Sequence, residues 1–90
     1  GAFAVLVECV TVDAGKAITE AVAVPTIGIG AGPHTTGQVL VTNDLIGLTQ
    51  GYTPKFVRKI ADASTLIRDA ATTYREAVAD RSFPGASESF

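Results

Sequence analysis

The chain opens on an apolar run, Phe3 to Val7, that carries no charge before Glu8. A run of this length and β-branched content is typical of a strand buried on both faces of a sheet. We therefore predict a first strand over 3–10. The two-residue repeat of a strand places alternate side chains on opposite faces. One face carries Ala4, Leu6 and Glu8, and the other carries Val5, Val7 and Cys9.

A helical pattern follows this strand. Thr11 predicts the N-cap of a helix over 12–22, and Asp13 is favourable in its first turn. The apolar residues expected to share one face of this helix are Ala14, Ala17, Ile18 and Ala21. Pro25 ends the connection and opens a second apolar strand over 25–29. Two strands joined through one helix predict a parallel pair with a right-handed crossover.

The remaining pattern is less regular. The chain between Gly32 and Gln38 is too short for a covering helix, so a third strand over 39–41 follows an abbreviated crossover. A helical turn is predicted over 45–48. Thr53 and Pro54 predict the N-cap and first position of a helix that runs to about Asp80, with a break near 62–65. Its charged face is an ordinary solvated face without function.

Composition narrows the classes of function. A hydrophobic content of 47% over 90 residues favours a packed globular chain. A net charge of −2 without a basic cluster argues against nucleic acid as a partner, and no apolar run reaches the length of a membrane span. One cysteine cannot form an internal disulfide, which fits the cytoplasm. A chain that lacks an initiator Met and opens on a buried strand is expected to be a piece of a larger protein.

Five stretches resemble ketopantoate hydroxymethyltransferase. They are 1–10 with Glu8, the Pro-Thr-Ile-Gly-Ile-Gly-Ala-Gly-Pro run at 25–33, 37–41, 53–57, and the ending with Phe83-Pro84-Gly85 and Ser89-Phe90. They cover essentially all of the chain, in order and at matching spacing, and they correspond to the last third of that enzyme. The resemblance implies an α/β fold in which residues 1–90 are the C-terminal segment of one (β/α)8 TIM-type barrel, with 39–41 as its eighth strand.

The same resemblance implies an activity. The family transfers a one-carbon unit from 5,10-methylenetetrahydrofolate to 3-methyl-2-oxobutanoate, giving 2-dehydropantoate in pantothenate biosynthesis. Glu8 matches the proton acceptor, and carbon–carbon bond formation through an enolate needs such a base. The resemblance further implies Mg²⁺ with ligands on earlier strands, outside this chain, and a cytoplasmic homo-oligomer. We therefore expect the chain to be inactive alone. The family has Pro where this chain has Thr11.

Other residues favour plainer interpretations. Glu8 taken alone would be a solvated or ion-paired strand-end carboxylate. The Gly28-x-Gly30-x-Gly32 pattern indicates a dinucleotide site only weakly, because Pro33 stands where a helix should begin and the third glycine of G-x-G-x-x-G is absent. A glycine-lined barrel rim that lets substrate or backbone approach closely is the preferred interpretation.

Four more candidate residues are assigned no catalytic or metal-binding role. An isolated loop residue such as His34 is seldom a metal ligand. Asp44 follows a strand tip, and a capping role is favoured because the family's metal ligands are upstream carboxylates. Lys55 is placed unfavourably for the dipole of the predicted helix, although its position in the Pro-Lys-Phe motif indicates a local contact. Cys9 is expected to be a packed thiol.

Two rival functions remain open. One is a non-catalytic structural or interface α/β fragment, whose open sheet edges pair with another chain. The other is a small nucleotide-binding domain, which requires a helix directly after the glycine-rich loop.

Overall fold

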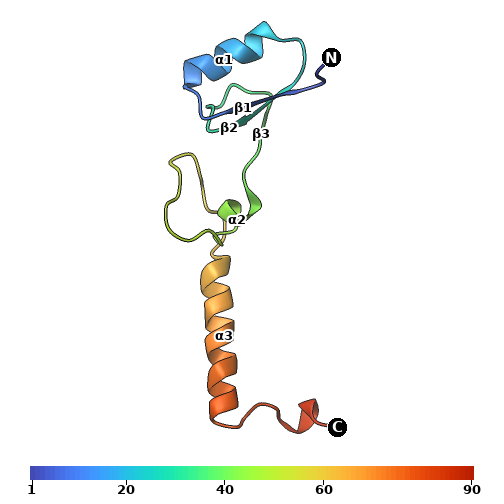
Figure 1. Ribbon diagram of the computed structural model, residues 1–90, viewed down its shortest axis with the longest axis vertical. Helices are drawn as coiled ribbons and strands as arrows, with labels where there is room; N and C mark the ends of the chain where they lie inside the picture. The colour runs from blue at the N-terminus through green and yellow to red at the C-terminus, as the bar shows by residue number, and fades with distance from the viewer.

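The computed structural model describes all 90 residues, which form three parts in chain order (Figure 1). A head of three strands and one helix is followed by a middle part with a short helix and a long loop, and then by a long helix. The molecule measures 65 × 28 × 16 Å and has a radius of gyration of 21.5 Å, whereas a compact domain of this length has about 12 Å. Only 7 of 90 residues are buried. The expectation of a packed globular chain is therefore wrong.

The head is a parallel α/β unit. Its elements are β1 (Val5–Glu8), α1 (Val12–Ala21), β2 (Thr26–Ile29) and β3 (Gly37–Gln38). The strand order is β1-β2-β3, and both pairs are parallel. The predicted parallel pairing is confirmed, with Val5 opposite Thr26 and Glu8 opposite Ile29. The right hand of the crossover stays a prediction.

Alternate side chains of β1 face opposite ways, as the two-residue repeat predicts. Val7 is 5% exposed on one face, while Leu6 is 60% exposed on the other. Glu8 lies exposed with Leu6. The strand is shorter than the predicted 3–10, because Cys9 turns to a φ of 53° and ends it. The face that carries Leu6 and Glu8 is the one that this chain leaves uncovered.

Helix α1 begins where predicted. The Thr11 hydroxyl accepts a hydrogen bond from the backbone N–H of Ala14 at 3.3 Å. The packed face differs from the prediction, because Ala17 and Ala21 are exposed and Gly15 is buried. A Cβ on Gly15 would lie 2.2 Å from the carbonyl oxygen of Ala31. The glycine therefore lets α1 approach the loop that follows β2.

Threonines join the elements of the head at the end of the sheet where β2 begins. The hydroxyl of Thr26, which is fully buried, lies 2.9 Å from that of Thr19 on α1. The backbone N–H of Thr36 donates to the Thr26 hydroxyl at 3.1 Å, and the N–H of Thr26 lies 3.2 Å from the Thr36 hydroxyl. This network satisfies polar groups inside the small core of the head.

The elements after the head lie elsewhere than predicted. The third strand is Gly37–Gln38 and not 39–41, and the following helical turn is α2 (Thr42–Leu45) and not 45–48. The long helix is α3 (Ala63–Ala79), so Thr53 is not its N-cap. Asp62 caps it instead, accepting hydrogen bonds from the N–H and the hydroxyl of Thr65.

The late start of α3 has a physical cause in the middle loop. The backbone N–H of Ile60 donates to Leu45, and that of Ala63 donates to Ile46, at 2.8 and 2.9 Å. These bonds tie Ile60 and Ala63 to the end of α2, and a helix that began at Thr53 would have used both N–H groups internally. The predicted break near 62–65 is therefore the true beginning of the helix.

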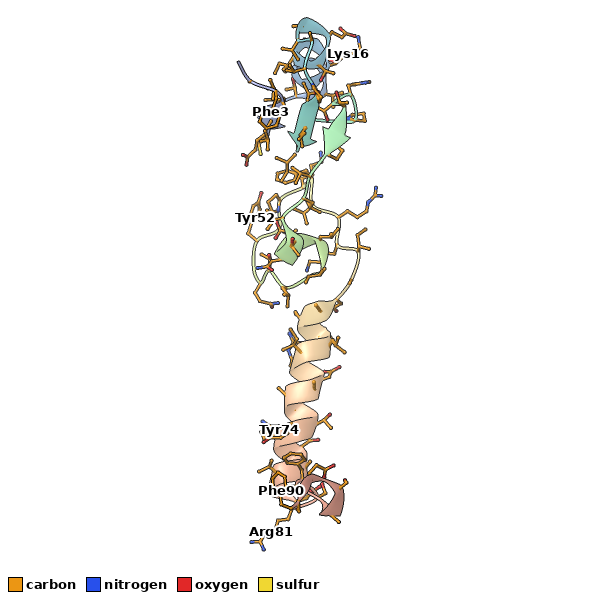
Figure 2. All side chains as sticks on the ribbon, turned by 90° about the vertical axis from the view of Figure 1, so that its right-hand side faces the viewer. Phe3, Lys16, Tyr52, Tyr74, Arg81 and Phe90 are labelled. Carbon is orange, nitrogen blue, oxygen red and sulfur yellow. The ribbon has the colours of Figure 1, made fainter.

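Helix α3 has no buried residue. Figure 2 shows its side chains projecting with no other element packed along its length. Its apolar stripe includes Ile67 and Tyr74, each 57% exposed, and Val78, 47% exposed. Beyond it, Phe83 meets Tyr74 edge-on with ring centroids 5.1 Å apart, and a short 3₁₀ helix, η1 (Ala86–Glu88), ends the fold.

Candidate active-site edge of the sheet

The carboxyl ends of the three strands meet at one edge of the head, which faces the middle part (Figure 1). Glu8 is the last residue of β1, Gly30 follows β2, and Gln38 ends β3. Parallel α/β folds bind ligands at this edge. Glu8 therefore stands where the sequence placed it, exposed at a strand tip.

Cys9 does not behave as predicted. Its positive φ takes it out of the strand repeat, and its thiol is exposed and free. The prediction that Cys9 is a packed thiol is therefore wrong, because the alternation of the strand stops at Glu8. Its N–H still donates to the carbonyl of Ile29 at 2.9 Å, which fixes the backbone immediately after Glu8.

The glycine-rich loop forms the centre of this edge. Gly30 and Gly32 have φ values of +62° and +77°, which side-chain-bearing residues rarely adopt. A Cβ on Gly30 would lie 2.7 Å from the ring of Phe56. Close approach at Gly30 is therefore present, but the approaching group is an aromatic side chain from the middle loop and not a backbone segment. The barrel rim and the approach of substrate stay predictions. The nucleotide-binding alternative is wrong, because residues 33–36 lead through turns into β3 without a helix.

Two shallow hollows share Phe56 as a lining residue. The first, of about 410 Å³, is lined by Val10, Thr11, Val12, Gly30, Gly32, Lys55 and Phe56. The second, of about 440 Å³, is lined by Gln38, Val39, Leu40, Phe56 and Arg58. Each hollow contains one cationic side chain and no carboxylate. The edge can therefore accommodate a small molecule that carries negative charge.

The middle loop corrects the interpretation of Lys55. No helix begins at Thr53, so the helix dipole does not act on Lys55. A turn closed by the N–H of Val57 on the carbonyl of Pro54, at 3.0 Å, presents Lys55 and Phe56 to the sheet edge. Sequence reasoning missed Phe56 and Arg58 as lining residues. The Pro-Lys-Phe motif was the signal that could have found the first.

Two other candidates have structural positions. His34 lies exposed in the turns before β3. Asp44 lies inside α2, and its carboxylate accepts a hydrogen bond from the hydroxyl of Thr49. The N-cap of α2 is Val41, so the capping role predicted for Asp44 is wrong; its carboxylate ties the middle loop back to the helix.

The residues of this chain do not fit a magnesium site by themselves. Magnesium in proteins is held by carboxylate and other oxygen ligands, and no group of three or more His, Cys, Asp or Glu side chains is close enough together to bind a metal ion. Glu8 is the one carboxylate at the ends of the three strands. Separately, none of the helices combines the length and the apolar composition that a membrane-spanning helix needs.

Comparison with known proteins identifies the family. Residues 1–86 match the family model described as ketopantoate hydroxymethyltransferase. The whole chain is 60% identical to 34% of a 3-methyl-2-oxobutanoate hydroxymethyltransferase from Rhodopirellula baltica. It is 49% identical to 34% of the protein of that name from Geobacter sulfurreducens, and 46% identical to 33% of that from Syntrophomonas wolfei. The chain thus spans about a third of the length of these relatives. It belongs to the ketopantoate hydroxymethyltransferase family, a family of enzymes.

Proposed function

We propose that this chain supplies the general base for one-carbon transfer from 5,10-methylenetetrahydrofolate to 3-methyl-2-oxobutanoate, giving 2-dehydropantoate in pantothenate biosynthesis. The observation that carries the proposal is the position of Glu8. It ends β1 on the uncovered face, at the carboxyl edge of the sheet, in a chain of this family.

The proposed chemistry of Glu8 is proton transfer. Its carboxylate takes a proton from C3 of the ketoacid, and the electron pair left on that carbon forms the new bond to the methylene carbon of the folate. The two carbon–nitrogen bonds that held this carbon break, tetrahydrofolate leaves, and water supplies the hydroxyl oxygen of the product. Glu8 makes no ion pair in this chain, since the one ion pair joins Lys16 to Glu20 on α1, so its carboxylate is free to accept a proton. Leu6, on the same face two residues earlier, provides an apolar neighbour for the branched substrate.

Three further expectations belong to this proposal. The parallel head is the C-terminal part of a (β/α)8 barrel, whose interior is the face that carries Leu6 and Glu8. The complete enzyme is a cytoplasmic homo-oligomer that also uses Mg²⁺ held by residues outside this chain. The chain alone is inactive, because a lone base cannot stabilise the enolate that it creates.

The non-catalytic interface fragment remains a second candidate, and one observation favours it. Helix α3 exposes an apolar stripe that nothing in this chain covers. Such a stripe is what a helix devoted to association would show.

A hybrid enzyme separates the two. In it, the 90 residues replace the matching third of the Rhodopirellula baltica relative. We expect the hybrid to form 2-dehydropantoate from the two substrates in a coupled spectroscopic assay, while the relative without that third and the 90 residues alone do not. A hybrid that is folded by circular dichroism but forms no product would contradict the catalytic proposal and favour the interface fragment.

A further inference from the structure

Each of the two hollows beside Phe56 carries one positive charge and no negative charge. Lys55 lines one and Arg58 lines the other, and no acidic side chain lines either. The only ion pair of the chain lies elsewhere, between Lys16 and Glu20. Both cations at the active-site edge are therefore without a carboxylate partner in this chain.

The position of these cations is built into the fold. A turn closes between Pro54 and Val57, and the bond from Ile60 to Leu45 ties the far end of the segment 54–60 to α2. The ring of Phe56 then lies against Gly30. A residue with a Cβ at position 30 would occupy the space of this ring. The two cations consequently line two hollows that share one aromatic ring.

This arrangement matches the chemistry of a carboxylate-bearing small molecule. Hollows of about 410 and 440 Å³ lie within the usual size range of ligand pockets. A guanidinium binds a carboxylate through two parallel hydrogen bonds, and an ammonium adds a mobile point charge. The aromatic ring that lines both hollows offers a flat apolar surface to a ligand.

We propose that Lys55 and Arg58, flanking Phe56, form an anion-binding rim that holds a carboxylate of one of the two reactants. The inference rests on the proposed function for the identity of those reactants. Two carboxylate sources fit the rim: the glutamate tail of the folate and the carboxylate of the ketoacid. Glu8 and the rim then have separate tasks, proton transfer and substrate binding.

The test uses the hybrid enzyme with Lys55→Gln, Arg58→Gln and, as a matched control, Lys59→Gln. Lys59 is a neighbouring exposed cation that lines neither hollow. Equilibrium dissociation constants are measured for tetrahydrofolate, for tetrahydropteroate, which lacks the glutamate, and for 3-methyl-2-oxobutanoate. Loss of a charged hydrogen bond should raise the relevant dissociation constant roughly 10- to 100-fold.

Each outcome decides the proposal. Weaker binding of tetrahydrofolate, with tetrahydropteroate unchanged, supports the rim and assigns it to the folate tail. Weaker binding of the ketoacid alone supports the rim and assigns it to that substrate. Dissociation constants equal to those of Lys59→Gln for all three compounds overturn the rim, even if the hybrid turns over normally. Rim-dependent binding in a hybrid without turnover overturns the proposed reaction and leaves the rim standing.

Discussion

Helix α1 and helix α3 are capped in the same way at their N-termini, but only α1 packs against the rest of the chain. Thr11 and Asp62 each cap a helix with a side-chain oxygen that accepts an N–H from three residues on. Helix α1 then packs through Gly15 against the loop after β2, whereas α3 buries nothing. Capping therefore decides where a helix begins, and a complementary surface decides whether it packs.

The largest effect on stability is expected when glycine and alanine are exchanged in the two helices. In an unpacked helix, Gly→Ala stabilises by about 1 kcal/mol. Gly15→Ala should instead destabilise the head by about 1–3 kcal/mol, since the new Cβ would meet the Ala31 carbonyl at 2.2 Å. Hydrogen exchange of the β1 and β2 amides measures this effect.

The matched exchange in α3 is Ala70→Gly. It should cost α3 about 1 kcal/mol of helix stability and leave exchange in the head unchanged. A Gly15→Ala variant whose head amides become better protected would show that α1 does not pack as described.

The next largest effect is expected at Thr26, in the threonine network. Thr26→Val keeps the shape of the side chain but removes the buried hydroxyl that accepts from the N–H of Thr36 and bonds to the hydroxyl of Thr19. The expected loss is about 1–3 kcal/mol in the stability of the head, read from amide exchange of β2. Thr73→Val on exposed α3 is the control, with an expected change within about 0.5 kcal/mol. Equal effects at the two positions would mean that the network contributes nothing.

The smallest effect is expected at the start of α3, and it depends on pH. Hydrogen bonds from the Thr65 hydroxyl, and then from the Thr65 N–H, lower the pKa of Asp62 below its ordinary value of 3.8. A carboxylate with a lowered pKa stabilises the folded helix above that ordinary value, and the stabilisation is lost as the pH falls through the lowered pKa. Far-ultraviolet circular dichroism should therefore show α3 fraying in acid.

Two variants sharpen this prediction. Asp62→Ala should show the fraying already at neutral pH and lose the acid transition, while Asp69→Ala, inside α3, should keep it. An acid transition that survives in Asp62→Ala would assign it to another carboxylate.

The sequence predicted the head well because its signals are local. The apolar run before Glu8, the cap at Thr11 and the strand opened by Pro25 each specify an element from neighbouring residues alone, and the structure contains all three. The start of α3 could not be predicted in this way. It depends on backbone bonds from Ile60 and Ala63 to α2, which follow from tertiary structure and not from the favourable Thr53-Pro54 pair.

The same distinction between local signals and tertiary structure applies to the candidate site. Glu8 was found from its place at the end of an apolar run and from the resemblance. Phe56 and Arg58 were missed, because only the path of the middle loop brings them to the sheet edge. Cys9 was assigned to the wrong environment, because its positive φ ends the strand one residue before it.

The most direct test of the account is the turnover of the hybrid enzyme with Glu8→Gln beside Cys9→Ala. Gln keeps the size of Glu8 and its capacity for hydrogen bonding but cannot accept the proton. We expect kcat to fall by about 10²–10⁴-fold for Glu8→Gln, with little change in the KM of the ketoacid. Cys9→Ala should leave kcat nearly unchanged, because the proposed proton transfer uses the carboxylate of Glu8 and needs no thiol, and the exposed thiol fills no core space. A Glu8→Gln hybrid that keeps full turnover, or a Cys9→Ala hybrid that loses it, would contradict the assignment of Glu8 as the base.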